Sequence, residues 1–281
     1  MYSTITIIGC GLIGGSLALT IHKHYPNSKL YGIDPNYTSI KTIPHANCFS
    51  LLSDTLNDIP KDTDLVIIAT PIHATVDTIK KVSMQVSQHC LISDVTSTKE
   101  ALLSEINTLD LKHPYISGHP MAGKETTGFD VASDTLFTNA PYILIDNSFV
   151  AEHKKLTEFL TSLSCNVTTC SKEVHDHLIA LVSHLPYLTA TALMQVATQT
   201  HTLKTIQTIF GPGFKDSTRL ASSAPLWGID VCNQNKANIV AAVEATINVL
   251  SDIKTMIQEN QTSALSNYLN ESKQKRDRLT S

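Results

Sequence analysis

A glycine-rich turn between a short apolar run and a helical stretch constrains this chain more than any other feature. Gly9, Gly11 and Gly14 follow the β-branched run at residues 5–8 and precede apolar residues with helical spacing up to Ile21. This order predicts a strand, a tight turn and a helix. Such glycines let the backbone approach a pyrophosphate at the positive end of the helix.

An acidic residue completes this pattern. Asp34 stands 20 residues after Gly14, at the end of the second predicted strand. There it would accept hydrogen bonds from adenine ribose hydroxyls and repel a 2′-phosphate, and no Arg closely follows, so NAD is favoured over NADP. Thr70 and Pro71 end a later strand at the same sheet edge. The expected cofactor-binding residues are Gly9, Gly11, Leu12, Ile13, Gly14, Asp34, Thr70 and Pro71.

Strands and helices alternate over the first part of the chain. This alternation predicts a doubly wound, mostly parallel α/β sheet domain over residues 1–171. The expected later strands are 65–71, 90–94, 115–118, 142–145 and 166–170, and the expected helices between them are 74–86, 99–106 and 152–163.

The pattern becomes helical after residue 171. Helical spacing runs over 172–204, broken only at Pro186, and again over 237–269, so residues 172–281 are expected to form an all-helical second domain. Long apolar helices in so small a domain leave faces that another chain would cover, which favours a homodimer over the alternative of a compact monomeric bundle.

Composition narrows the function classes. The 281 residues exceed what one core usually supports, and 42% hydrophobic content rules out a disordered chain. The net charge of −4, with a basic stretch only at the tail, makes nucleic acid an unlikely partner. No signal peptide and no run long enough for a bilayer are expected, so we predict a cytoplasmic protein without a membrane partner. Six irregularly spaced cysteines indicate reduced thiols.

Histidines and hydroxyl groups follow the predicted strand ends. His119 lies between Gly118 and Pro120, just past a strand end, where a stiff backbone suits a positioned base. Ser97 belongs to a run of small hydroxyl residues, a pattern that also serves helix capping. The metal-like pair His175 and His177 is rejected, because residues two apart lie on different faces of a helix, and no metal is expected.

Polar residues also interrupt the helical part. Ser183 and His184 precede Pro186, which removes a backbone donor and frees a carbonyl group one turn earlier. Asp216 and Arg219 stand three apart between two helical stretches. An Arg is suited to bidentate capture of a carboxylate, and Asp216 could orient it.

With these motifs together, the chain resembles the prephenate/arogenate dehydrogenase (TyrA) family over essentially its whole length. The matching segments are 9–16, 94–99, 118–125, 183–186 and 213–219. The resemblance implies a Rossmann-like domain followed by a helical dimerisation domain. It also implies NAD-dependent oxidative decarboxylation of prephenate to 4-hydroxyphenylpyruvate in tyrosine biosynthesis.

The resemblance also implies residue roles. His119 would hydrogen-bond the ring hydroxyl of the substrate and act as the base, Ser97 would orient that hydroxyl, and Arg219 would bind a substrate carboxylate. The remaining substrate-binding positions it implies are Glu125 and Asp216, in an ionic network around the arginine, and Ser183 and His184, which line the pocket. Tyr187 replaces a histidine of some members, which leaves the choice between prephenate and arogenate open.

Other function classes remain as alternatives. A β-hydroxyacid dehydrogenase or imine reductase also pairs this type of sheet domain with helices. The hydroxyacid enzymes would show a catalytic lysine on the interdomain helix, where this chain has Ser183 and His184. A non-catalytic regulator that binds NAD would bind the cofactor without turnover.

Overall fold

The computed structural model describes residues 2–124 and 126–280. The chain divides into two compact units, residues 1–236 and 237–281, which are treated separately below. The first unit holds the sheet and the helices up to α10 (Pro225–Gln234). All six cysteines belong to the described residues and are free thiols.

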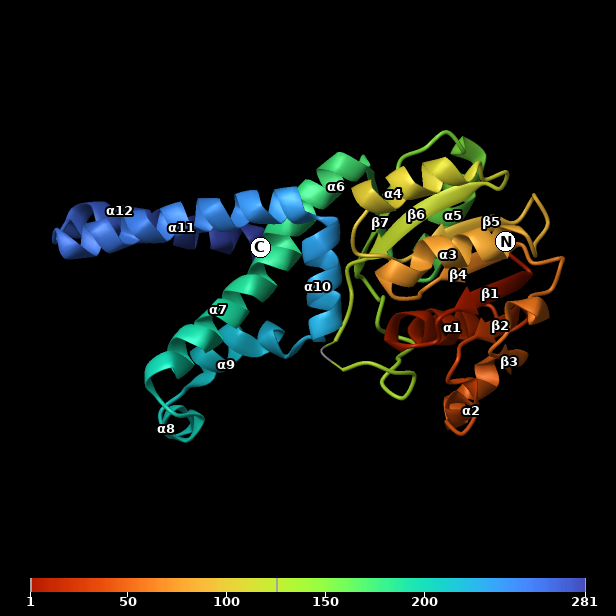
Figure 1. Cartoon of the computed structure of the whole chain (residues 1–281), viewed down its shortest axis with the longest axis horizontal. Helices are drawn as coiled ribbons and strands as arrows, with labels where there is room; N and C mark the ends of the chain where they lie inside the picture. Colours follow the sequence, from red (N-terminus) through yellow and green to blue (C-terminus); the bar gives the residue numbers. More distant parts are fainter. Residues whose placement is uncertain (1, 125, 281) are drawn as a thin grey trace. The chain divides into compact units, whose positions relative to one another are not determined.

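The first unit contains an eight-stranded sheet in the order β3-β2-β1-β4-β5-β6-β7-β8. Neighbouring strands are parallel except β6 and β7, which are antiparallel, so the predicted mostly parallel sheet is confirmed (Figure 1). The strands are β1 (Thr4–Ile8), β2 (Lys29–Ile33), β3 (Leu51–Ser53), β4 (Leu65–Ile68), β5 (Leu91–Asp94), β6 (Tyr115–Pro120), β7 (Pro141–Ile145) and β8 (Asn166–Cys170). The short strand β3 was not predicted.

Helices cover both faces of this sheet. Side chains of α1 (Leu12–His24) and α5 (Val150–Ser162) share one apolar cluster with alternate strand residues such as Ile7. Those of α3 (Ile72–Ser83) and α4 (Glu100–Ile106) form the opposite cluster with neighbours such as Ile8. Because successive strand residues point to opposite faces, a strand covered on both sides is apolar throughout, which explains the continuous apolar runs. The short elements are α2 (Tyr37–Ile40), Pro44–Cys48, Leu56–Asp58 and Asn107–Leu109.

The carboxyl ends of β1, β4, β5 and β6 lie at one edge of the sheet, because these strands run parallel. The chain leaves β1 toward β2 and β3 on one side and returns as β4 on the other. Ligands of open α/β sheets bind at such a reversal of strand order. The glycine turn after β1 and the histidine near the end of β6 therefore share this edge.

One continuous helix follows β8. It consists of α6 (Lys172–Ile179), a π-helical turn (Ala180–His184) and α7 (Leu185–Thr200). The predicted break at Pro186 is therefore wrong, because the wide π turn precedes it and the helix continues. Wide turns of this kind release backbone groups and occur often at functional sites. The shorter elements beyond it are α8 (Leu203–Gln207), α9 (Pro212–Thr218), Arg219–Ser222 and α10 (Pro225–Gln234).

This helix is also apolar. Its 29 residues from Lys172 to Thr200 are long and apolar enough to cross a membrane by length and composition alone, so the expectation that no segment meets these two criteria is wrong. The core helix of a soluble protein passes the same test. In the helix from Lys172 to Thr200, the exposed apolar side chains are Val174, Leu178, Leu181, Val182, Leu193 and Val196.

The second unit consists of α11 (Lys236–Gln258) and α12 (Thr262–Thr280). The helical pattern predicted over 237–269 is present as two helices, because the chain turns between them. Asn260 has a positive φ of 53° in that turn, a conformation that Asn adopts more readily than most residues. Helix α11 keeps several large apolar side chains exposed, namely Val240, Ile247, Val249, Leu250 and Ile257.

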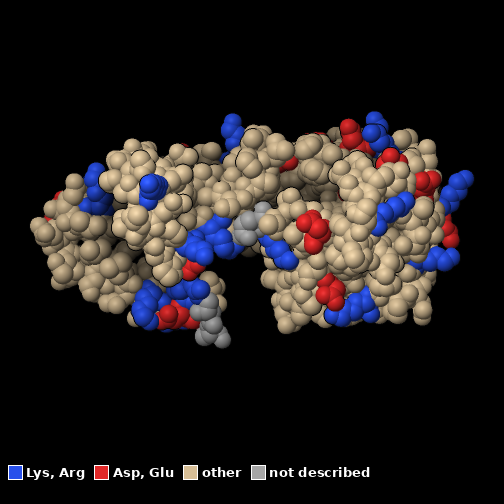
Figure 2. Space-filling model, turned by 90° about the horizontal axis from the view of Figure 1, so that it is seen from below, with Lys and Arg blue, Asp and Glu red and all other residues tan. Residues whose placement is uncertain are grey.

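Charged residues are mixed on the face that Figure 2 shows. Over the sheet domain, Lys and Arg side chains alternate with Asp and Glu along the rim, and wide uncharged areas lie between them. Over the sheet domain, this face shows no continuous basic stripe of the kind that tracks a nucleic acid backbone.

Candidate active site

His119 lies within β6 and not beyond its end as predicted. It pairs with Ile143 of the antiparallel neighbour β7, and Pro120 is the last residue of the strand. The strand extends this far because β7 supplies a partner from the side opposite to β5. Only 7% of the surface of His119 is exposed. The ladder thus fixes the backbone of this histidine at the carboxyl edge of the sheet.

A chain of hydrogen bonds connects His119 to helix α6. Its Nδ1 lies 2.9 Å from Nε2 of His175, and Nδ1 of His175 lies 2.7 Å from Oδ1 of Asp176. A carboxylate only accepts, so Nδ1 of His175 carries a proton, and in the neutral form of this ring its Nε2 accepts. His119 must then donate from Nδ1. This assignment leaves the lone pair of His119 on Nε2, the atom that a general base requires.

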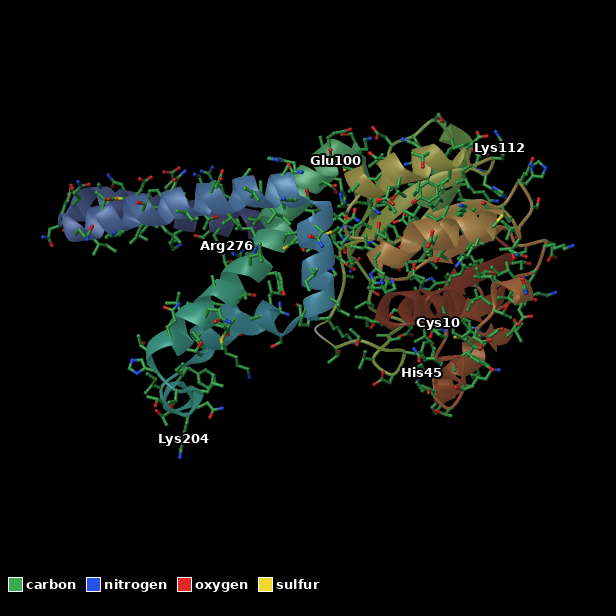
Figure 3. All side chains as sticks on the ribbon, in the orientation of Figure 1. Cys10, His45, Glu100, Lys112, Lys204 and Arg276 are labelled. Carbon is green, nitrogen blue, oxygen red and sulfur yellow. The ribbon has the colours of Figure 1, made fainter. Side chains whose placement is uncertain are left out.

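Asp176 is held by the start of α4. Its carboxylate accepts hydrogen bonds from the backbone N–H of Lys99 at 2.9 and 3.1 Å and of Glu100 at 2.9 Å. Figure 3 labels Glu100 where α4 begins beside α6. These bonds satisfy N–H groups that a helix start leaves without intrahelical partners. Asp176 thus joins the orientation of His175 to the packing of two helices.

The surroundings of His119 favour its neutral form. Burial lowers the pKa of His119 well below the ordinary 6.5, and the positive charge of Lys99 adds to this effect, followed by His175 and His184. A charged imidazolium loses its hydration when it is buried, which disfavours it. His119 is therefore an unprotonated base at neutral pH.

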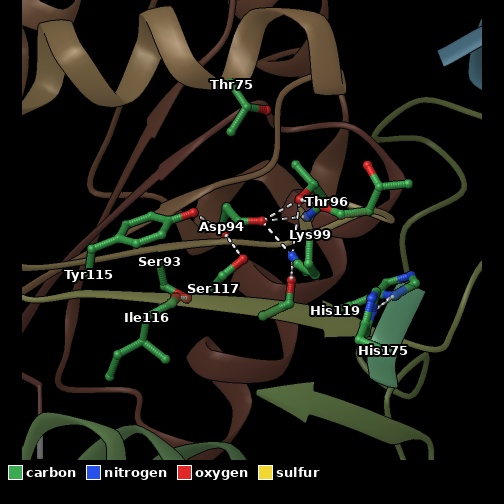
Figure 4. Close-up of polar contacts among 12 residues, drawn as sticks. Thr75, Ser93, Asp94, Thr96, Lys99, Tyr115, Ile116, Ser117, His119 and His175 are labelled. Atoms are coloured by element: carbon green, nitrogen blue, oxygen red, sulfur yellow. Dashed lines mark hydrogen bonds and ion pairs between the residues drawn. The ribbon is translucent and has the colours of Figure 1, made fainter. Parts of the chain in front are cut away.

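A second polar network lies directly beside His119 (Figure 4). Asp94, at the end of β5, accepts hydrogen bonds from the hydroxyls of Tyr115 and Ser117 on β6 and pairs with Lys99 at 2.8 Å. Burial alone would raise the pKa of Asp94, but the ammonium of Lys99 and the surrounding hydrogen bonds hold it below its usual value. This network joins β5, β6 and the start of α4.

Aromatic residues form another part of the site. Trp227 of α10 donates from Nε1 to Oγ of Ser97 at 3.3 Å, and its ring packs against Tyr187 and His184 with centroids 5.2 and 6.1 Å away. Tyr187 in turn lies against Gly228, where a Cβ would come within 2.5 Å of the hydroxyl oxygen. The structure therefore brings Ser97, His184 and Tyr187 together around Trp227.

His184 offers a hydrogen-bond donor. The side-chain amide nitrogen of Asn235 lies 3.4 Å from Nδ1 of His184. An amide nitrogen only donates, so Nδ1 of the neutral His184 ring accepts and its Nε2 carries the proton. Nε2 is buried and has no hydrogen-bond partner among the residues that the structure describes. Burial lowers the pKa of His184 to about 4, which keeps this ring neutral. A buried donor without a partner suits an oxygen atom of a ligand.

The glycine turn has the geometry that a dinucleotide requires. Gly9 has a φ of 89° and lies against Ala69, whose carbonyl oxygen a Cβ would approach to 2.5 Å, and a Cβ on Gly14 would meet the Gly9 carbonyl at 2.0 Å. At Gly11 a Cβ would meet nothing within 4 Å. The turn is therefore packed on its inner side and open at its second glycine, where helix α1 begins with Leu12 and Ile13. These residues fit a bound pyrophosphate.

Asp34 supports this turn directly. Its carboxylate accepts hydrogen bonds from the backbone N–H of Cys10 at 2.8 Å and of Asn36 at 2.7 Å. Figure 3 labels Cys10 in the turn after β1. Each carboxylate oxygen can accept a further bond, so Asp34 remains suited to ribose hydroxyls. Thr70 and Pro71 follow β4 beside Gly9, and Pro71 precedes the first residue of α3.

Other predicted site residues lie outside these contacts. Asp216 and Arg219 are exposed on α9 and the turn after it, and the interactions of His119 given above do not include them. Ser183 is half-buried in the π turn. Glu125 lies outside the described residues. Within residues 2–124 and 126–280, no three His, Cys, Asp or Glu side chains are grouped to hold a metal ion.

Comparison with known proteins decides the family. The family model for the prephenate dehydrogenase nucleotide-binding domain matches residues 17–167, and that for the dimerization domain matches residues 171–271. The prephenate dehydrogenase of Bacillus subtilis (strain 168) is 30% identical over 284 residues, covering 99% of this chain and 76% of that protein. The chain belongs to the prephenate dehydrogenase family.

Solved structures agree with this assignment. The prephenate dehydrogenase from Aquifex aeolicus, crystallised with hydroxyphenyl propionate and NAD+, is 28% identical with a TM-score of 0.91, over 99% of this chain and 98% of that one. The arogenate dehydrogenase of Synechocystis is 26% identical with a TM-score of 0.82, over 98% and 99% of the two chains. These matches confirm the predicted α/β domain and helical dimerisation domain. A dimerisation domain implies a dimer, and the family is one of soluble biosynthetic enzymes.

Sequence reasoning missed four residues of this family member's site. His175 was considered only as part of a metal-like pair and Asp176 received no role, although α6 brings His175 beside His119 and Asp176 beside His175. Lys99 lies in the matching segment 94–99 but was given no role, and Trp227 was given no role either. A lysine in a strand-end motif that also holds an acid, and the single tryptophan of the chain, were the available signals.

Proposed function

We propose that this chain catalyses the NAD-dependent oxidative decarboxylation of prephenate to 4-hydroxyphenylpyruvate, a step of tyrosine biosynthesis. The observation that carries the proposal is the buried His119, whose Nε2 lone pair is set by His175 and Asp176 at the sheet edge that also holds the glycine turn. The 30% identity to the Bacillus subtilis prephenate dehydrogenase supports it.

The chemistry needs one base and a hydride acceptor. When bound, NAD supplies the acceptor for the hydride that leaves C4 of the substrate. Neutral His119 takes the proton of the C4 hydroxyl through Nε2 and later returns it to the phenol oxygen. Loss of the ring carboxylate as CO2 makes the ring aromatic, so the step is effectively irreversible.

Neighbouring residues orient the substrate in this proposal. Ser97, which accepts a hydrogen bond from Trp227, orients the reacting hydroxyl beside His119. His184 donates from Nε2, and Ser183 and Tyr187 line the same pocket. Arg219 binds a substrate carboxylate, with Asp216 and Glu125 in an ionic network around it. Orientation is the main contribution of Arg219, because clamping the departing carboxylate tightly would stabilise the ground state.

NAD is the proposed cofactor. The open backbone at Gly11, the start of α1 at Leu12 and Ile13, and the carboxylate of Asp34 support this choice. An acid at Asp34 disfavours the 2′-phosphate of NADP by charge. The relative from Aquifex aeolicus was crystallised with NAD+.

Assembly and boundaries form the last part of the proposal. The exposed apolar side chains of α7 and α11 support a homodimer through the helical domain. We place the boundary between the NAD-binding and the dimerisation domain at residue 171, between the end of β8 and the start of α6. The chain functions in the cytoplasm, with no nucleic acid or membrane partner.

Arogenate is the second candidate substrate. Tyr187 packs against Trp227 in the pocket, and the Synechocystis relative is an arogenate dehydrogenase. Such an enzyme would give tyrosine directly.

The test is the appearance of NADH absorbance with prephenate or arogenate, each with NAD and with NADP. Turnover of prephenate with NAD is expected. Turnover of arogenate but not of prephenate would contradict prephenate as the substrate. Equal use of NAD and NADP would contradict the role of Asp34 in favouring NAD. NAD binding without turnover of either substrate would favour the hypothesis of a non-catalytic regulator.

A further inference from the structure

Lys99 is an unusually buried charged residue. Its side chain and that of Asp94 are 0% exposed. Its Nζ lies 2.8 Å from Oδ1 of Asp94, 3.0 Å from the hydroxyl of Thr96 and 2.6 Å from the backbone carbonyl of Gly118 (Figure 4).

These contacts favour the charged form of Lys99. The carboxylate and the carbonyl only accept, and the Thr96 hydroxyl, which lies 2.6 Å from Asp94 and donates to it, accepts from the lysine. An ammonium has three N–H donors for these three acceptors, whereas a neutral amine has two. Burial lowers the pKa of Lys99 from its ordinary value, but the charge and hydrogen bond of Asp94 oppose this effect, and the three acceptors favour the ammonium.

The positive end of this ion pair faces His119. The second carboxylate oxygen of Asp94, Oδ2, accepts hydrogen bonds from the hydroxyls of Tyr115 and Ser117, toward the start of β6. Lys99 instead binds the carbonyl of Gly118, the residue directly before His119. The pair thus acts as an oriented dipole along β6.

We propose that Lys99 is a positioning residue for the reaction: its ammonium fixes the end of β6 through Gly118 and disfavours a second positive charge on the His119 imidazole, which keeps His119 an unprotonated base. This inference rests on the proposed function for its catalytic meaning. The electrostatic part concerns the protein alone.

The other groups around His119 do not supply a permanent positive charge. His175 of α6 accepts from His119 and donates to the carboxylate of Asp176, which carries the opposite charge. His184 of the π turn is neutral because burial lowers its pKa to about 4. From α10, Trp227 carries no charge, and Asp230 lies 3.1 Å from His73. Among these groups, Lys99 is the fixed cation, and its charge adds to burial in lowering the pKa of His119.

The test compares His119 titration in three variants. Lys99→Met removes the cation. The double variant Asp94→Asn/Lys99→Met removes both charges. It leaves no unpaired carboxylate buried in the core, so it is less destabilised than Lys99→Met alone. Tyr115→Phe breaks a hydrogen bond of the same network and leaves Lys99 charged, so it controls for loosened packing. His119 is followed by NMR of its ring signals in the cofactor-free protein, assigned with His119→Asn, and the acidic limb of kcat with NAD and prephenate is measured in parallel.

We expect the His119 pKa to rise by about one unit or more in Lys99→Met, because a nearby like charge shifts a pKa by that order, and to rise by less in the double variant, because Asp94→Asn also removes a negative charge. The acidic limb of kcat should move to higher pH by a similar amount, and Tyr115→Phe should leave both in place. An unchanged His119 titration in folded Lys99→Met or in the folded double variant would overturn the proposal, as would an equal rise in Tyr115→Phe. The NMR result stands even if prephenate is not turned over, so failure of the proposed function is seen separately.

Discussion

Replacing Asp176 with Asn tests the hydrogen-bond chain behind His119. The carboxylate accepts from three N–H groups, those of His175, Lys99 and Glu100. An amide oxygen has two lone pairs, so at least one of these donors faces the new NH2 group. The buried donor left without a partner costs roughly 1–3 kcal/mol, and each remaining bond loses the benefit of the negative charge, about 1 kcal/mol.

The free energy of unfolding should therefore fall by about 4 kcal/mol in Asp176→Asn. For a unit of this size that corresponds to a fall in Tm on the order of 10 °C. The effect on catalysis has a separate cause. If the new amide donates to Nδ1 of His175, the proton moves to its Nε2, His119 receives a hydrogen bond at Nδ1, and its own Nε2 is protonated. We expect kcat to fall by about 10²-fold, within the range for a general base.

The assay is thermal unfolding together with kcat, KM and the Kd for NAD at one pH. Asp134→Asn is the matched control, because Asp134 pairs with Lys23 at 2.8 Å on an exposed surface, where such pairs contribute at most about 1 kcal/mol. Asp176→Asn with the Tm and kcat of the parent protein would refute the argument. A fall in Tm with unchanged kcat would separate the packing role of Asp176 from its effect on His119.

Three further predictions concern the same site. His119→Asn should lower kcat by roughly 10²–10⁴-fold with NAD affinity nearly intact, and near-normal turnover would remove His119 from the chemistry. Arg219→Ala should mainly raise KM, and an unchanged KM would contradict its carboxylate role. Because burial lowers the pKa of His184 to about 4, the unfolded chain binds this proton more readily. Stability should thus fall as pH drops below about 6.5, by about 3 kcal/mol near pH 4 for this group alone, measured by urea unfolding. A flat pH dependence there would contradict this assignment.

The order of the secondary structure could be predicted from local patterns. The glycine turn, the apolar strand runs and the helical spacing after residue 171 indicated the sheet, its helices and the helical part, because period and turn chemistry are properties of neighbouring residues. Strand β3 was missed because three residues carry too little periodicity. The prediction of a helix break at Pro186 was wrong, because the spacing of apolar residues does not show the π turn that precedes the proline.

The residues of the site could be predicted only in part from the sequence. His119 could be singled out because glycine and proline flank it, and Asp34 because its distance from the glycine turn is fixed by one βαβ unit. His175, Asp176, Lys99 and Trp227 could not be assigned, since their partners are 56, 77, 19 and 130 residues away along the chain.

The sequence alone thus determined where backbone conformation is restricted: the open glycine turn, the acid after β2 and the stiff segment around His119. Tertiary structure decided the protonation state of that histidine. Its tautomer depends on a carboxylate from α6, and its low pKa depends on burial and on the Lys99 ammonium, which reaches Gly118 from the start of α4. Burial and through-space charge arise only when β5, β6, α4 and α6 pack together, so no local pattern can contain them.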